Sequence, residues 1–233
     1  MTARVVIDDA TGRGEAIAVL QGGGLVGLPT DTVYGIGVAL AAPRGIERLF
    51  EAKGRLPDKA VMLLLAESGQ AADVGVLNPA TRVLAAACWP GALTLVLRQK
   101  PGAAIPPALT AGASTIGVRL PDHPAPRALA AAVGPLPVTS ANRSGSPALA
   151  TAAEVVITLG DSLDLVLDGG PARSERPSTV VDCSTGVPRL LREGAIAAAT
   201  LAAILDAAGL PHELSGSGTA THRSESGQHR PPA

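Results

Sequence analysis

The chain has 233 residues and a formal net charge of −1, with 19 Lys and Arg against 20 Asp and Glu. Hydrophobic residues make up 46% and aromatic residues only 1%, so a core has to be built from aliphatic side chains. This composition excludes global disorder, base-stacking surfaces, and a protein whose whole surface attracts nucleic acid through positive charge.

Histidine and cysteine are too scarce in this chain for several common kinds of site. Only His123 among the histidines precedes residue 212, and the two cysteines, Cys88 and Cys183, are far apart. A zinc site, a Cys/His pair or a Ser/His/Asp triad needs more of these residues. Separated cysteines are typical of a reducing compartment, and neither a secretory signal nor a long apolar run is apparent. We therefore expect a cytoplasmic protein with no membrane contact.

Apolar runs and Ala-rich amphipathic patterns alternate along the first 210 residues. The apolar runs predict strands at Arg4–Ile7, Leu25–Leu28, Val61–Leu65, Leu93–Leu97, Thr115–Leu120, Leu136–Thr139, Leu165–Leu167, Thr179–Cys183 and Arg189–Leu191. The amphipathic patterns predict helices at Gly14–Gln21, Pro43–Lys53, Pro79–Cys88, Pro124–Val133, Ala152–Leu159 and Ala195–Ala208. Several of these helices begin with proline, which suits the first turn of a helix.

The order of these elements favours an α/β fold, in which helices pack on a layered sheet. Some successive strands have no helix between them, so we expect a mixed sheet rather than a purely parallel one. Beyond Pro211 the chain is rich in Ser, Gly, Thr and His and has no apolar periodicity. We therefore predict one domain over residues 1–210 and a disordered tail over residues 211–233.

One glycine-rich segment has the pattern of a dinucleotide-binding fingerprint but not its context. Residues 22–27 satisfy G-x-G-x-x-G, yet they follow a predicted helix and lead into a predicted strand. The fingerprint requires a strand before the glycines and a helix after them. We interpret these glycines as the C-terminal cap of the helix.

Four segments place polar side chains at the ends of predicted elements. They are residues 28–35 (LPTDTVYG), Lys53 with Arg55, residues 137–145 (PVTSANRSG), and residues 177–182 (PSTVVD) followed by Arg192. Each segment also has a simpler interpretation, because turn hydroxyls bond their own backbone and long cations extend into solvent.

Lys53 differs from an ordinary surface lysine because it lies on the apolar face of its predicted helix. Ile46, Leu49, Phe50 and Lys53 follow the spacing i, i+3, i+4 and i+7. A lysine on such a face either extends along the apolar stripe to solvent or points into a cleft.

Taken together, the segments indicate a site for a polyanion. The candidate cations are Lys53, Arg55, Arg119 and Arg192, and the candidate neutral hydrogen-bonding groups are Thr30, Thr115, Ser140, Asn142 and Ser178. No side chain among them resembles an activated nucleophile. Such a set suits in-line attack at phosphorus, where positioning and charge neutralisation supply most of the catalysis.

The motifs PTDTVYG, KGR, TIGVR, TSAN, STVVD and LREG, in this order and spacing, resemble those of the YrdC-like threonylcarbamoyl-AMP synthases. The resemblance covers the chain from about Gly14 to Ala208, and it is to the short, single-domain form. It implies a single-domain, three-layer α/β fold with a mixed, twisted sheet and helices on both faces. It also implies a nucleotidyltransferase that condenses L-threonine, bicarbonate and ATP into threonylcarbamoyl-AMP and pyrophosphate.

The resemblance assigns roles to individual residues of this sequence. It implies that the phosphates and the reacting carbamate are contacted by the catalytic residues Lys53, Arg55, Ser140 and Asn142. It implies an ATP site formed by Lys53, Arg55, Thr115, Ser140 and Arg192. It implies a threonine site formed by Thr30, Arg119 and Ser178, in which Arg119 pairs with the carboxylate.

The same resemblance implies Mg²⁺ bound with ATP, with no dedicated metal site formed by the protein. The product would supply the tRNA threonylcarbamoyl-transferase machinery that makes threonylcarbamoyladenosine, and weak contact with tRNA is compatible with that role. Leu56 and Ala60 stand where the family often has proline. We also hypothesise that residues 171–177 (PARSERP), bearing Arg173, Glu175 and Arg176, form a mobile flap over the site.

Two alternative functions are considered. A related domain makes carbamoyl-adenylate within hydrogenase maturation proteins, but those carry an acylphosphatase-like region and cysteine zinc motifs that this sequence lacks. A YrdC-like module could instead act mainly as an RNA-binding factor. The intact K-x-R and S-x-N signatures favour an enzyme, and scarce lysines and aromatics argue against extended contact with RNA.

Overall fold

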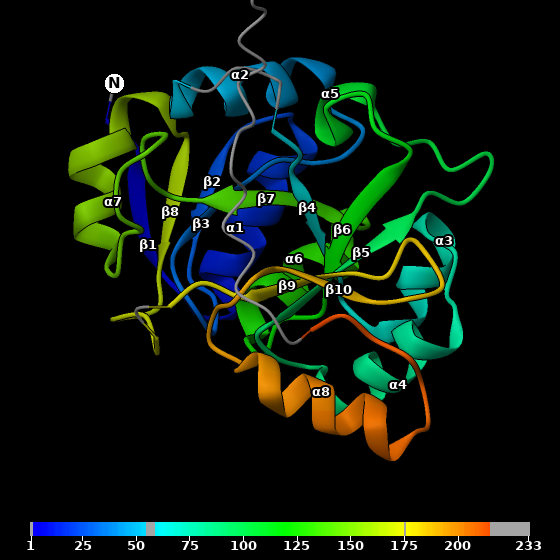
Figure 1. Ribbon diagram of the computed structural model, residues 1–233. Coiled ribbons are helices and arrows are strands. Elements are labelled where there is room, and N and C mark those ends of the chain that lie inside the picture. The colour runs from blue at the N-terminus through cyan, green and yellow to red at the C-terminus, as the bar shows by residue number, and fades with distance from the viewer. Residues whose placement is uncertain (1, 55–58, 175, 215–233) are drawn as a thin grey trace, which may run out of the picture.

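The computed structural model describes residues 2–54, 59–174 and 176–214. The described residues form a ten-stranded sheet in the order β1-β8-β2-β3-β7-β4-β6-β5-β9-β10 (Figure 1). The strands are β1 (Arg4–Ile7), β2 (Val26–Leu28), β3 (Gly35–Gly37), β4 (Met62–Leu64), β5 (Leu93–Arg98), β6 (Thr115–Arg119), β7 (Leu136–Ser140), β8 (Leu165–Asp168), β9 (Thr179–Asp182) and β10 (Arg189–Arg192).

The sheet is mixed, as expected from the element order. β8 lies between β1 and β2 and runs parallel to both, although it follows them by more than a hundred residues. β4 is parallel to β6, and β5 is parallel to β9. The other neighbouring pairs are antiparallel.

Helices cover both faces of the sheet, so the predicted α/β architecture is confirmed. On one face α1 (Ala10–Gln21) packs against α6 (Pro124–Val133), with Leu20 and Leu129 fully buried in one apolar cluster. A second, larger cluster takes side chains from the remaining helices. These are α2 (Pro43–Lys53), α3 (Ala71–Val74), α4 (Pro79–Cys88), α5 (Pro107–Thr110), α7 (Ala152–Leu159) and α8 (Ala198–Ala207). In Figure 1, α2 lies above the sheet and α4 and α8 lie together below it.

Most of the predicted elements are present with small shifts of their boundaries. α1 begins at Ala10 instead of Gly14, because Asp9 caps it by accepting a hydrogen bond from the Gly12 N–H at 2.8 Å. β3, α3 and α5 were not predicted. Gly22 caps α1 and the chain continues into β2, which agrees with the interpretation of the glycine-rich segment.

The packed chain continues past the predicted domain boundary at residue 210. Leu214 is buried in the larger apolar cluster, and the Glu213 N–H donates to the Pro188 carbonyl at 2.8 Å. The prediction of a disordered tail is therefore wrong for residues 211–214. Residues 215–233 lie outside the described part of the chain.

The register of the central strands separates the predicted site residues into two groups. In the register of the sheet, Val138 and Leu136 of β7 pair with Met62 and Leu64 of β4. Leu64 also pairs with Arg119 of β6 on its other side. The end of β7 at Ser140 and the start of β6 at Thr115 thus lie toward one end of these strands, and Arg119 lies toward the other. Ser178 and Arg192 belong to the Arg119 end, because Arg192 pairs with Val180 and Val180 with Thr94.

Candidate functional site

A cavity of about 540 Å³ brings three of the four predicted segments together. Its floor carries apolar side chains of β4 and β7, among them Met62, Leu64 and Val138. Its polar wall is formed by Thr30, Thr32, Arg119, Thr139, Ser140, Asn142, Ser178 and Arg192. A few directed polar groups over an apolar floor are typical of a small-molecule site.

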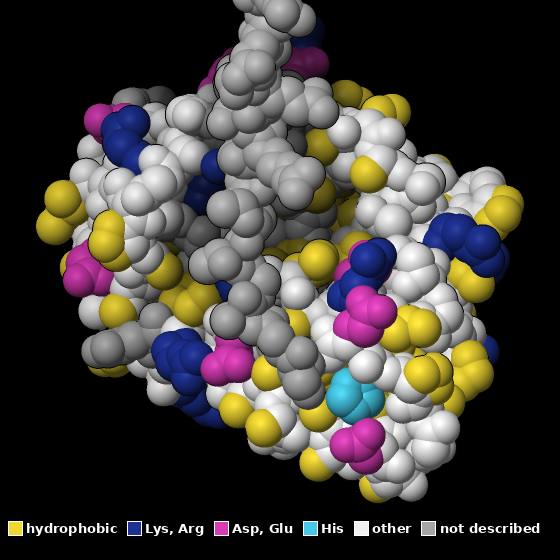
Figure 2. All heavy atoms as spheres, viewed as in Figure 1, with side chains coloured by type: hydrophobic (Ala, Val, Ile, Leu, Met, Phe, Trp, Pro, Cys, Tyr) yellow, Lys and Arg dark blue, Asp and Glu magenta, His cyan; other side chains and the backbone are white. Residues whose placement is uncertain are grey.

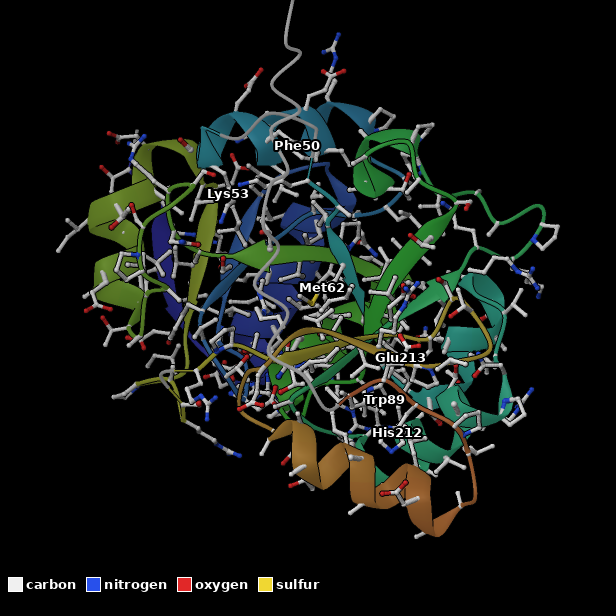
Figure 3. The ribbon with its side chains drawn as sticks, viewed as in Figure 1. Phe50, Lys53, Met62, Trp89, His212 and Glu213 are labelled. Carbon is white, nitrogen blue, oxygen red and sulfur yellow. The ribbon has the colours of Figure 1, made fainter. Side chains whose placement is uncertain are left out.

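Lys53 lies behind one end of this cavity, where it contacts the lining residues Ser140 and Asn142. Its side chain is nearly fully buried, and Nζ donates to the Ser140 carbonyl at 2.5 Å and to Asn142 Oδ1 at 2.9 Å. Ser140 Oγ lies 3.3 Å from the same nitrogen. The lysine therefore points inward to the oxygens of Ser140 and Asn142 rather than along the helix surface, and Figure 3 labels it beneath α2. Gly54 ends α2 in the left-handed conformation, with φ of 57°.

Asn142 holds the chain that follows β7 in place around the lysine. Its Oδ1 accepts a hydrogen bond from Ser140 Oγ at 2.5 Å, and its Nδ2 donates to the Ser146 carbonyl. The Ser144 N–H donates to the Lys53 carbonyl at 3.0 Å. The predicted group of Lys53, Ser140 and Asn142 is thus one connected cluster.

Arg119 stands at the other end of the cavity and is anchored by three separate contacts. Its Nη2 forms a buried ion pair with Asp31 at 2.5 Å, its Nη1 donates to Thr32 Oγ1 at 2.9 Å, and its Nε donates to the Gly91 carbonyl at 3.0 Å. Burial lowers the pKa of the Arg119 guanidinium, and the neighbouring charge of Asp31 opposes that shift. A guanidinium has five N–H groups, so this anchored side chain still has donors to offer a ligand.

Thr30 and Thr32 shape the loop after β2 that carries Asp31. Thr30 Oγ1 donates to the Val33 carbonyl at 2.6 Å and accepts from the Thr32 N–H at 3.1 Å. Thr30 therefore bonds its own backbone, as the simpler interpretation of this segment has it, and it lines the cavity as well. The turn brings Asp31 and Thr32 to the Arg119 guanidinium.

Ser178 and Arg192 form the wall beside Arg119. Arg192 donates from Nε and Nη2 to the Ser178 carbonyl at 3.2 and 2.9 Å. Burial and the nearby charge of Arg119 lower the pKa of Arg192. Gly194 lets the chain after β10 lie close to residues 177–178, because a Cβ there would lie 2.2 Å from the Pro177 carbonyl oxygen.

Two predicted site residues, Lys53 and Thr115, are not among the described residues that line the cavity. Thr115 begins β6 and shares the strand face of Gly117 and Arg119, since side chains alternate along a strand. Arg55 lies outside the described residues, as does Leu56, and its position stays a prediction. Within residues 171–177, Pro177 lines the cavity and Arg176 pairs with Glu193 at 3.7 Å, whereas Glu175 is not described. The flap stays a prediction too.

Sequence reasoning missed several residues that build the site. Asp31 and Thr32 lie within the PTDTVYG segment, yet only the pairing across the fold reveals their contact with Arg119. Met62 lines the cavity although it looks like an ordinary strand residue (Figure 3). The Gly91 carbonyl carries no sequence signal, because any residue offers a backbone oxygen.

Thiol and resident-metal chemistry receive no support from the described residues. Burial raises the pKa of Cys183 to about 12 and also raises the pKa of Cys88, so neither thiol is a ready nucleophile. No group of three or more His, Cys, Asp or Glu in the described chain is arranged to hold a metal ion. No described helix is both long and apolar enough to cross a bilayer.

The described residues form an α/β fold with a cavity between a lysine-hydroxyl-amide cluster and a pair of arginines. Comparison with known proteins identifies the family. The Sua5_yciO_yrdC family model, described as "Telomere recombination", matches residues 18–194. This chain belongs to the Sua5/YciO/YrdC family.

Several members of this family are similar over most of the chain. A threonylcarbamoyl-AMP synthase of Bacillus subtilis (strain 168) is 37% identical over 193 residues, which are 82% of this chain and 56% of that protein. A putative threonylcarbamoyl-AMP synthase of Mycobacterium tuberculosis (strain ATCC 25618 / H37Rv) is 37% identical over 198 residues, 84% of this chain and 90% of that protein.

A crystal structure of Sua5 from P. abyssi in complex with L-threonine matches with a TM-score of 0.81 and 29% identity. The match covers 91% of this chain and 62% of that one. This chain thus spans little more than half of the Bacillus relative and most of the mycobacterial one.

Proposed function

We propose that this protein is an L-threonylcarbamoyladenylate synthase, which makes threonylcarbamoyl-AMP and pyrophosphate from L-threonine, bicarbonate and ATP. The observation that carries the proposal is the pairing of two polar clusters in one cavity. One end is lined by Ser140 and Asn142, with Lys53 bonded to both of them, and the other end is lined by Arg119, Ser178 and Arg192. The relatives named as synthases support the same assignment.

The two clusters suit the two halves of the reaction. Threonine would bind at the Arg119 end, where a guanidinium fork complements a carboxylate. The phosphates of ATP would bind at the Lys53 end, and Thr115 lies toward the same end of the central strands. The amine of threonine takes up carbon dioxide or bicarbonate to give a carbamate. A carbamate oxygen then forms the bond to the α-phosphorus as the bond to pyrophosphate breaks, so no protein nucleophile is needed.

Mg²⁺ is proposed to enter with ATP and not as a resident ion. The cavity offers neutral oxygen ligands, such as Thr139, Ser140 and Asn142, whereas Mg²⁺ prefers carboxylates and phosphates and keeps several waters. This set of donors fits an ion carried mainly by the triphosphate. When bound, the ion would neutralise charge on the leaving pyrophosphate.

The product is proposed to pass to the tRNA threonylcarbamoyl-transferase machinery in the cytoplasm. A primarily RNA-binding role is less well supported. On the face seen in Figure 2, Lys and Arg side chains lie in separate groups with Asp and Glu among them, rather than in one continuous basic track.

Pyrophosphate release from ATP tests the proposal, measured in full mixtures and in mixtures that lack threonine or bicarbonate. We expect release only when all three substrates are present. Release that ignores either omission would contradict the proposed function. Tight, salt-dependent binding of tRNA without any turnover of ATP would favour the RNA-binding alternative.

A further inference from the structure

A buried hydroxyl behind the cavity wall contacts one of the proposed threonine-binding residues. Thr94 Oγ1, on β5, lies 2.8 Å from Ser178 Oγ, and both residues are 2% exposed. Ser178 lines the cavity, whereas Thr94 is not among the described residues that line it. Arg192 Nη2 contacts the same Ser178 oxygen at 3.4 Å.

The hydrogen-bonding capacity of these groups limits the direction of each bond, and of the two bonds to Ser178 Oγ only the one with Thr94 can run either way. A hydroxyl has one proton to donate and two lone pairs, and a guanidinium can only donate. Arg192 therefore uses one lone pair of Ser178 Oγ. Thr94 has two acceptors within reach, Ser178 Oγ at 2.8 Å and the Met62 thioether at 3.7 Å, of which the hydroxyl oxygen is the nearer and the stronger. When an anionic oxygen in the cavity takes the Ser178 proton, Thr94 donates to Ser178 and fills its second lone pair.

With both lone pairs of its oxygen in use, Ser178 has only its own proton left to share. That proton is available to an acceptor in the cavity, and an anionic oxygen is the best acceptor. Thr94 is well placed to hold this arrangement, because its γ-methyl lies beside Gly117 of β6, 3.5 Å from the point that a Cβ on this glycine would occupy. A β-branched side chain packed in this way has little freedom about χ1.

We propose that Thr94 is a positioning residue for the substrate carboxylate. It donates to Ser178 when Ser178 donates to the carboxylate, and so Ser178 and Arg119 hold the two sides of the same anionic group. The inference rests on the proposed function, which supplies the carboxylate. Thr94 itself touches no substrate.

Thr94→Val removes the hydroxyl and keeps the shape. We expect the KM for L-threonine to rise about tenfold, as the loss of a hydrogen bond to a charged group predicts. The KM for ATP and kcat should stay within about twofold, because the Lys53 end of the site is unchanged. Thr94→Ser, which restores the hydroxyl, should return the KM for threonine to near the wild-type value.

Two controls separate positioning from a general loss of stability. Thr110→Val removes an equally buried hydroxyl from α5, where it donates to the Pro107 carbonyl, and should leave both KM values unchanged. L-Threoninol lacks the carboxylate, so as a competitive inhibitor it should bind the wild type and Thr94→Val equally. If the valine variant fails to fold by circular dichroism, Thr94→Cys provides a weaker donor and should change the KM in the same direction.

A Thr94→Val enzyme with an unchanged KM for threonine would overturn the inference, as would equal rises in both KM values or failure of Thr94→Ser to restore binding. These outcomes differ from a failure of the proposed function. In that case the wild-type protein itself would show no threonine-dependent release of pyrophosphate.

Discussion

At the scale of single residues, the site depends on charges held by buried partners. Lys53 and Arg119 are each 3% exposed, but their surroundings differ. Oxygens of Ser140 and Asn142 surround the lysine, whereas a carboxylate pairs with the arginine. Buried charges are tolerated only with such partners, so the two cations should respond differently to substitution.

Lys53→Ala and Ser140→Ala should each reduce turnover at least about a hundredfold, as expected when a donor to developing charge is lost. Pyrophosphate release measures the loss, and circular dichroism should show that the fold persists. Lys100→Ala, at an exposed loop position, is the matched control and should keep full activity. Unfolding of the two site variants would instead show that the cluster serves the fold.

Asp31→Asn should lower the free energy of unfolding by roughly 3–5 kcal/mol, since it leaves the Arg119 charge buried without its partner. It should also raise the KM for threonine, because the guanidinium loses an anchor. Urea unfolding and steady-state kinetics measure the two effects. Arg48→Ala breaks the exposed pair with Asp164, whose side chains are 41% and 40% exposed, and should cost at most about 1 kcal/mol. Equal costs for the two variants would refute this prediction.

The sequence identifies many of the residues in the site but not their partners. Lys53 is predictable because a cation on an apolar helix face is unusual. Asp31 is not, because its partner Arg119 lies 88 positions away and only the fold brings them together. Arg192 was assigned to ATP, and the structure places it beside Ser178 instead of beside Lys53.

At the scale of elements, the start of α6 contains a titratable cap. His123 Nδ1 accepts a hydrogen bond from the Ala125 N–H at 3.2 Å, and the ring is half-buried. Burial lowers the pKa of His123. Protonation would remove the acceptor that caps the helix, so the neutral ring is the form that stabilises α6.

The lowered pKa of His123 makes stability depend on pH. Below the ordinary histidine pKa of about 6.5, the unfolded chain binds more protons than the folded one. The free energy of unfolding therefore decreases as the pH decreases. The stability that neutral His123 contributes is fully present above about pH 6.5, and it is lost as the pH drops toward the lower folded-state pKa. His123→Asn keeps a capping oxygen without a titrating group. Between about pH 7.5 and pH 5.5, the free energy of unfolding measured in urea should therefore decrease less for the variant than for the wild type. Identical decreases would contradict the role of His123 as a titratable cap.

Element prediction failed where packing overrides local preference. β3 has the sequence Gly-Ile-Gly, and glycine disfavours a strand. Glycine is nevertheless required at position 35, because a Cβ there would lie 2.7 Å from the Val138 side chain of β7. That contact joins residues a hundred positions apart, so the local sequence cannot reveal it.

At the scale of the whole molecule, the alternation of elements predicts the α/β class, but the order of the strands requires the fold itself. β8 pairs with β1 and β2 although β3 to β7 lie between them in the chain. The apolar runs that mark these strands are interchangeable in composition. Composition also misplaces the end of the domain, because Pro211–Leu214 contribute one buried leucine within a polar segment.

Shortening the chain tests where the domain ends. A chain that stops at Leu214 keeps all contacts that the structure describes, so its thermal midpoint should match that of the full chain. A chain that stops at Leu210 loses the buried Leu214 side chain and should be less stable by about 1.5–3 kcal/mol. Differential scanning calorimetry measures both, and equal midpoints for the two shortened chains would restore the boundary at residue 210.

Trp89 has a use that follows from its surroundings. It is the only tryptophan of the chain, and its indole N–H donates to the Leu93 carbonyl at 2.7 Å. Two residues later, the Gly91 carbonyl accepts the Arg119 Nε hydrogen bond. The protein therefore carries an intrinsic fluorophore beside the anchor of its proposed carboxylate-binding arginine. Any shift of indole emission during a threonine titration can be assigned to this corner of the molecule without an added label.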